Sequence, residues 1–142
     1  MKHLFENHDL TTESCGQFID ITDDVIAAVD RSGVAYGQVV VYSPHTTCAV
    51  FINEDESGFK ADFLELMDEL VPRVGRAYRH DEHDGEDFPN GHSHVRTALL
   101  SSTSQTIPIV DSRPVLGTYQ RVFFCELDRA RPRKLFVQVT GD

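Results

Sequence analysis

Residues Gly117 to Leu127 have the sequence Gly-Thr-Tyr-Gln-Arg-Val-Phe-Phe-Cys-Glu-Leu, which alternates between two sets of side chains. Successive side chains of a strand point to opposite faces, so the alternation predicts one long strand. The two sets are Tyr119, Arg121, Phe123, Cys125 and Leu127 on one face and Gln120, Val122, Phe124 and Glu126 on the other.

The rest of the chain predicts more strands than helices. β-Branched and aromatic runs predict strands at 18–21, 38–42, 46–52, 106–110 and 135–140. Apolar periodicity predicts helices that start at Thr22, at about Gly58 and at Ser93. Because the late strands have connections short enough for hairpins, we expect an α+β fold with largely antiparallel β-sheets and a few packed helices.

Each predicted helix has one apolar face that we expect to pack inward. The residues on these faces are Val25, Ile26 and Val29; Phe59, Phe63, Leu66, Met67 and Leu70; and Val95, Ala98 and Leu99.

The size and composition indicate a single globular domain over residues 1–142. No apolar run is long enough to span a bilayer, and the first residues lack the apolar core of a signal peptide, so we expect a cytoplasmic protein with no membrane partner. Three widely spaced cysteines predict reduced thiols.

The net charge of -10 argues against a nucleic-acid partner, because phosphate contacts need clustered Lys and Arg. The short basic run from Arg129 to Lys134 has two interpretations. It is either a solvated turn between strands or a place where one arginine faces an anionic ligand.

Four of the seven histidines lie in the acidic run from His80 to His94. Imidazoles beside carboxylates suit a divalent cation or a proton-transfer site, whereas the alternative is a solvated surface loop. We expect His80 and His94 to belong to a site. We expect His83 and His92 to be solvated.

His45 follows Pro44 at a strand end, where functional side chains commonly project into a cleft. We expect it to transfer protons or to bind metal, with a structural histidine as the alternative. Cys48, three residues further on, could border the same site. Asp62 falls at the edge of the apolar stripe of its helix, facing either solvent or a pocket.

Taken in order, several short segments resemble the YjbQ-like family, also called the secondary thiamine-phosphate synthase family. These segments are His45-Thr46-Thr47, Ile52-Asn53-Glu54, Asp62, Leu70-Val71-Pro72, Tyr78-Arg79-His80, Ser93-His94, Gly117-Thr118-Tyr119-Gln120 and Glu126. Two positions depart from the usual pattern: Cys48 replaces alanine and Tyr119 replaces tryptophan. These departures suggest a changed substrate preference.

The resemblance implies a homotrimer with a polar pocket near a subunit boundary and a bound divalent metal. It also implies a weak transferase activity that joins hydroxymethylpyrimidine diphosphate to a thiazole phosphate and releases pyrophosphate. The expected partner is therefore a small phosphorylated molecule.

Carried onto this chain, the pattern assigns three sets of site residues. The expected catalytic residues are His45, Glu54, Asp62 and Glu126; the expected ligand-binding residues are Thr46, Thr47, Asn53 and Gln120; and the expected metal ligands are His80, His94 and His45. Zinc or manganese would suit the histidines, whereas magnesium would favour carboxylates such as Asp62, Glu54 or Glu126.

Gln120 and Glu126 are too far apart to share one small site within a subunit, since six residues of strand span roughly 20 Å. We therefore expect Glu126 in a site completed across an interface, with the alternative that Gln120 instead ties down backbone. Two other functions stay open: a trimeric protein that binds a metal or small ligand without catalysis as its main role, and a metal-dependent phosphoester hydrolase.

Overall fold

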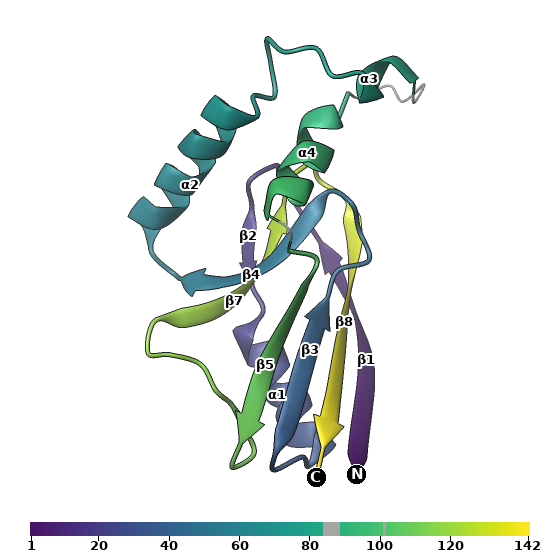
Figure 1. Ribbon diagram of the computed structural model, residues 1–142, viewed down its shortest axis with the longest axis vertical. Helices are drawn as coiled ribbons and strands as arrows, with labels where there is room; N and C mark the ends of the chain where they lie inside the picture. The colour runs from purple at the N-terminus through teal and green to yellow at the C-terminus, as the bar shows by residue number, and fades with distance from the viewer. Residues whose placement is uncertain (84–88, 101) are drawn as a thin grey trace.

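The computed structural model describes residues 1–83, 89–100 and 102–142, in which the strands form two antiparallel sheets (Figure 1). The larger sheet contains, in spatial order, β1 (Lys2–Thr11), β8 (Pro132–Gly141), β3 (Gly37–Tyr42), β5 (Ser104–Val110) and β6 (Arg113–Pro114). The smaller sheet contains β2 (Phe18–Asp20), β7 (Gln120–Glu126) and β4 (Cys48–Glu54). The predicted α+β fold with largely antiparallel sheets is confirmed.

The helices of the described residues are α1 (Thr22–Ser32), α2 (Ser57–Leu70), α3 (His80–His83) and α4 (Gly91–Leu100). Among them, no helix has both the length and the apolar character needed to cross a membrane. Residues 84–88, which form the acidic middle of the histidine-rich run, lie outside the described residues.

The strand β1 is absent from the sequence-based prediction. Its residues His3, Glu6, Asn7 and Asp9 give it little of the β-branched or aromatic character that marks a strand. It is held by antiparallel pairing to β8 along its whole length, from Lys2 opposite Gly141 to Thr11 opposite Pro132. Long-range pairing rather than local preference therefore makes this segment a strand.

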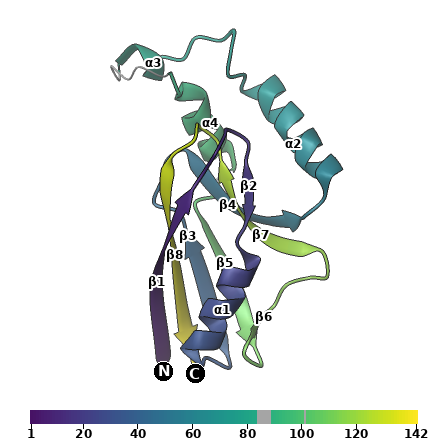
Figure 2. The same cartoon turned by 180° about the vertical axis from the view of Figure 1, so that it is seen from behind.

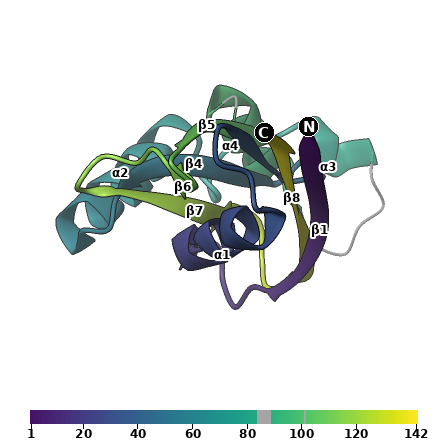
Figure 3. The same cartoon turned by 90° about the horizontal axis from the view of Figure 1, so that it is seen from below.

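The main core lies between α1 and one face of the larger sheet (Figures 2 and 3). Val25 and Val29 of α1 are fully buried, as predicted, but Ile26 is 36% exposed and its predicted inward position is wrong. Asp20 accepts hydrogen bonds from the backbone N–H and the hydroxyl of Thr22 at the start of α1. Gly33 ends the helix with a left-handed φ of 65°.

The strand β7 is buried on both faces, in agreement with the alternation of its sequence. Val122 and Phe124 pack into the main core, whereas Cys125 joins a second cluster that also contains Ala49 and Leu127. Because this strand separates two apolar layers, its polar residue Glu126 is completely buried.

The helix α2 follows its predicted range, but its apolar face is only partly covered. Met67 is 6% exposed, whereas Leu66 and Leu70, both predicted to be buried, are 50% and 56% exposed. Figure 1 shows that α2 stands away from the larger sheet. Its contacts with aromatic rings of the smaller sheet come from Phe59 and Phe63, in the first half of the helix.

The helix α4 turns the opposite face inward from the one predicted. Val95 and Leu99 are 40% and 59% exposed, whereas Arg96 is 2% exposed. The guanidinium of Arg96 donates to the backbone carbonyl of Val71 at 3.0 and 2.8 Å and forms an ion pair with Asp68. A satisfied arginine therefore takes the inward position that apolar periodicity assigned to valine and leucine.

Candidate functional site

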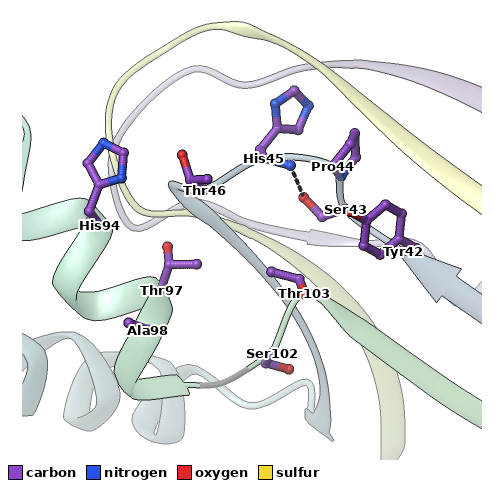
Figure 4. Close-up of a pocket in the computed structure, with 10 residues that line it drawn as sticks. All are labelled: Tyr42, Ser43, Pro44, His45, Thr46, His94, Thr97, Ala98, Ser102 and Thr103. Atoms are coloured by element: carbon purple, nitrogen blue, oxygen red, sulfur yellow. Dashed lines mark hydrogen bonds between the residues drawn. The ribbon is translucent and has the colours of Figure 1, made fainter.

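Two adjoining cavities lie where the loop between β3 and β4 meets α4 and the start of β8. They have volumes of about 530 and 280 Å³ and share the lining residues Pro44, His45, Thr46 and His94. Figure 4 draws the larger one, with His45 on the loop and His94 on α4 at the same end. We call the two cavities together the His45–His94 pocket.

The loop that carries His45 is fixed by its neighbours. Ser43 is 1% exposed, and its backbone N–H donates to the carbonyl of Thr103 at 2.8 Å. The backbone N–H of His45 donates to the Ser43 hydroxyl at 3.4 Å, the dashed line of Figure 4. These bonds anchor the corner after β3 and place the half-buried imidazole of His45 at the rim of the pocket.

The tautomer of His45 follows from one hydrogen bond. The backbone N–H of Lys134 donates to Nε2 of His45 at 2.8 Å, so a neutral ring carries its proton on Nδ1. Burial and the nearby Arg133 guanidinium lower the pKa of His45, which favours this neutral form near pH 7. The ring is therefore suited to donate from Nδ1.

His80 and His94 lie together, although they are separated by the loop between α3 and α4. Their ring centroids are 4.3 Å apart with an interplanar angle of 56°. His94 lines both cavities, whereas His80 is not among their lining residues. The structure thus pairs the two histidines that the sequence selected.

The smaller cavity is lined by strong hydrogen-bond donors. Arg131 and Arg133 are its charged side chains, and the others are Pro44, His45, Thr46, Thr47, Asn90 and His94. Guanidinium groups bind phosphate and carboxylate oxygens well, because their donors are planar and always charged. In a chain of net charge -10, these two arginines give the cavity the donor chemistry that suits an anion.

Arg133 is held in place by Glu126. Its Nε and Nη2 donate to the two carboxylate oxygens at 2.7 Å each, and Nη2 also donates to the Thr47 hydroxyl at 3.1 Å. Burial opposes the charge of Arg133, but the bonds to Glu126 outweigh it and raise the pKa of the guanidinium. The cation is therefore fixed before any ligand arrives.

Glu126 itself lies behind the pocket. Its side chain is 0% exposed, and it also accepts from the Thr12 hydroxyl at 2.8 Å and the Asp128 N–H at 2.9 Å. This differs from the expectation of Glu126 in a site completed across an interface, because no part of the side chain reaches the surface. Glu126 is a positioning residue for Arg133.

A second buried carboxylate, Asp128, organises the other side of the smaller cavity. It is 4% exposed and lies 3.3 Å from Nη2 of Arg131. It also accepts from the side-chain amide of Asn90 at 3.3 Å. Asn90 and the two arginines were not among the expected site residues. The basic run from Arg129 to Lys134 was the sequence signal for the two arginines.

The remaining expected residues lie elsewhere in the chain. In the pairing of β4 with β7, Glu54 lies opposite Gln120 and Asn53 lies opposite Arg121. These pairs are at one end of the two strands, and the Cys48–Glu126 pair, next to the pocket, is at the other end. Gln120 lines a separate cavity of about 450 Å³ beside α1. Asp62 is exposed on α2, which confirms its solvent-facing alternative. Within one subunit, these residues therefore lie apart from the residues that line the His45–His94 pocket.

The donors for a metal ion are incomplete within residues 1–83, 89–100 and 102–142, where no group of three His, Cys, Asp or Glu side chains could hold one. His80 and His94 supply two, but a catalytic zinc takes three protein ligands. The Nε2 lone pair of His45 is engaged by Lys134. His80 and His94 therefore do not complete a zinc site by themselves.

Two further expectations can be compared with the structure. His92 is 5% exposed, so its predicted solvation is wrong; burial and the neighbouring arginines lower its pKa. Cys48 is buried with its Sγ 3.7 Å from Glu126, and burial beside that carboxylate raises the pKa of the thiol to about 12. Cys48 is therefore a thiol rather than a thiolate nucleophile near neutral pH.

The sequence matches the family described as "UPF0047 protein YjbQ-like" over residues 6–142. The chain belongs to this family. A UPF0047 protein of Archaeoglobus fulgidus is 40% identical over 129 residues, which cover 91% of this chain and 95% of the relative. The UPF0047 protein YugU of Bacillus subtilis is 32% identical over 139 residues, with coverage of 97% and 100%.

Solved structures of other UPF0047 YjbQ-like proteins share the fold. A Clostridium acetobutylicum protein of this family superposes with a TM-score of 0.83 at 40% identity and covers 95% of this chain and 99% of its own. A YbjQ-like protein of unknown function from Sulfolobus solfataricus gives a TM-score of 0.83 at 28% identity and covers 99% of each chain. The expected family and fold are thereby confirmed.

Proposed function

We propose that the His45–His94 pocket binds a small phosphorylated molecule and catalyses a transfer that expels pyrophosphate, as in a thiamine-phosphate synthase. The observation that carries the proposal is the smaller cavity, where Arg131, Arg133 and two imidazoles line the same space. Fixed donors aimed at developing negative charge are a large source of rate enhancement in a pocket shielded from water.

In the proposed reaction, the thiazole nitrogen attacks the methylene carbon of hydroxymethylpyrimidine diphosphate. A carbon–nitrogen bond forms, the carbon–oxygen bond breaks, and the electron pair of that bond leaves with pyrophosphate. Arg131, Arg133 and the Nδ1–H of His45 would donate to the departing oxygens, while Thr46 and Thr47 would bind the same group. The assignment rests on donor chemistry and on the tautomer set by Lys134.

The test measures formation of thiamine phosphate and of pyrophosphate from the two substrates. Arg131→Gln removes a donor from the cavity and should lower kcat/KM on the order of a hundredfold. Arg31→Gln is the matched control, because Arg31 is an exposed residue of α1 paired with Glu6. Binding of both substrates without turnover in the wild type would favour a ligand-binding protein instead.

A divalent cation at His80 and His94 is a second proposal, favoured by the 4.3 Å separation of their rings. Such a site, with a further ligand added to the two histidines, would favour the alternative of phosphoester hydrolysis. Titration with zinc, manganese and magnesium, each with a panel of phosphoesters, tests it. Equal and weak binding by the wild type and by His80→Ala/His94→Ala would refute the cation site.

We also propose that the protein is a homotrimer. The support is the separation of two polar clusters in one subunit, one at the pocket and one formed by Asn53, Glu54 and Gln120 at the opposite end of the smaller sheet. The exposed leucines of α2, Leu66 and Leu70, offer apolar surface for a contact between subunits. Light scattering should give about three times the chain mass, and a folded monomer at micromolar concentration would contradict it.

A further inference from the structure

Three aromatic rings form a column on the outer face of the larger sheet, the face opposite α1. Phe5 on β1 stacks on Phe136 of β8, with ring centroids 5.4 Å apart and an interplanar angle of 25°. Phe136 in turn stacks on Tyr42 of β3, at 6.3 Å and 14°. The rings thus lie nearly parallel and cross three neighbouring strands, β1, β8 and β3, visible side by side in Figure 1.

The column ends at the proposed ligand site. Tyr42 lines the larger cavity together with His45 and His94, and it is 43% exposed (Figure 4). The residue opposite Tyr42 on the next strand, β5, is Ser104, whose small side chain does not continue the column. A planar ring in the cavity could therefore take the next position in the stack.

We propose that Tyr42 is the stacking surface for a planar aromatic ring of the ligand, whose phosphate group is bound at Arg131 and Arg133. The inference rests on the proposed function and assigns the residue that binds the planar ring of its phosphorylated substrates. The Tyr42 cavity and the arginine cavity share the lining residues Pro44, His45, Thr46 and His94, so they adjoin, and the proposed ligand would extend from one into the other.

The residues that line the larger cavity favour the binding of a small molecule with a polar ring rather than contact with the surface of another protein. Five residues with hydroxyl groups line the larger cavity beside Pro44, Ala98 and the two imidazoles: Ser43, Thr46, Thr97, Ser102 and Thr103. Hydroxyls can bond to ring nitrogens and substituents, whereas a protein contact generally buries a more apolar patch. The volume of about 530 Å³ is also within the range of small-molecule sites.

The experiment compares three probes of the same anionic group: inorganic phosphate, phenyl phosphate and cyclohexyl phosphate. The two esters have rings of similar size, but only the phenyl ring is planar and aromatic. Offset stacking should make phenyl phosphate bind about twofold to tenfold more tightly than cyclohexyl phosphate. Calorimetry or competition with a fluorescent phosphate ester measures the ratio.

Variants separate stacking from burial. Tyr42→Phe retains the ring and should keep the preference for phenyl phosphate. Tyr42→Leu keeps an apolar side chain without a ring and should reduce the ratio to about one, with no change in the affinity for inorganic phosphate. Phe5→Leu is the matched control, because Phe5 belongs to the same column but lies outside the cavity lining, so it should keep the preference.

The outcomes distinguish this inference from the function on which it rests. If inorganic phosphate binds but the wild type shows no preference between the esters, or Tyr42→Leu keeps it, stacking on Tyr42 is refuted and the anion site stands. If no probe binds, the proposed function fails together with the stacking surface. If Tyr42→Leu also changes the molar mass by light scattering, Tyr42 is a contact between copies of the chain, which overturns the proposal.

Discussion

Glu126→Gln should strongly destabilise the fold, although the two side chains have almost the same shape. The carboxylate accepts from Arg133 twice at 2.7 Å, from Thr12 at 2.8 Å and from the Asp128 N–H at 2.9 Å. These bonds are shared equally, two to each oxygen. An amide keeps one acceptor oxygen and places an NH2 group against the other two donors.

The loss can be estimated from these contacts. Two hydrogen bonds to a charged group are worth about 1.5–3 kcal/mol each, and removing one partner of a buried ion pair typically costs about 3–5 kcal/mol. The Thr12 hydroxyl can rotate to accept from the new amide, which places the expected loss near the lower end, at about 3 kcal/mol. That corresponds to a fall in melting temperature on the order of 10 °C.

Urea unfolding of both proteins at the same protomer concentration measures this loss with the concentration dependence of assembly held constant. Glu54→Gln is the matched control, because Glu54 lies at the exposed end of the same strand pair, and it should stay within about 0.5 kcal/mol of the wild type. Glu126→Gln/Arg133→Met removes the unpaired cation and should recover much of the stability. A Glu126→Gln loss below about 1 kcal/mol, or no recovery in the double variant, would refute the assigned role.

Three further predictions concern the pocket and the surface. His45→Asn places an amide nitrogen near the position of Nδ1, whereas His45→Gln only keeps an acceptor for the Lys134 N–H. Turnover should therefore be higher in His45→Asn than in His45→Gln. Equal losses of turnover in the two variants would indicate a general base. Burial is the main cause that lowers the pKa values of His45 and His92 in the folded chain. Below about pH 6.5 the unfolded chain therefore takes up protons that the folded chain does not, so the free energy of unfolding should fall from pH 7 to pH 5. A free energy of unfolding that does not change over this range would contradict the prediction. Leu66→Lys/Leu70→Lys should reduce the molar mass of the oligomer in light scattering. It should cost little monomer stability, since both leucines are at least half exposed. An unchanged molar mass would exclude this face of α2 from the interface.

The fold was predictable from the sequence wherever the local pattern and the tertiary contacts agree. The alternation before Glu126 predicted β7 because both faces of that strand pack against apolar layers. The strand β1 was missed because its polar residues are ordered by pairing with β8, a contact between opposite ends of the chain. The inward face of α4 was predicted wrongly because Arg96 finds its partners in Asp68 and Val71.

The site was predictable in part for the same reason. His80 and His94 could be selected because acidic and imidazole side chains are concentrated around them in the sequence. Arg133 could not be selected with confidence from sequence, because its position depends on a carboxylate of another strand that is buried beneath it. A site built from three separate segments leaves a weak signal in each one.

The two arginines of the smaller cavity should therefore contribute in different ways. Arg133 is 5% exposed and bonded to Glu126 through two donors, so its charge is compensated and its geometry fixed before binding. The Arg131 side chain is 27% exposed, with its Nη2 3.3 Å from Asp128, so it is more accessible than Arg133 to an anion in the cavity. Substitution of Arg133 should act first on the free energy of unfolding, and substitution of Arg131 first on ligand affinity. The more buried Arg133 thus mainly stabilises the pocket, whereas the more exposed Arg131 mainly binds the ligand.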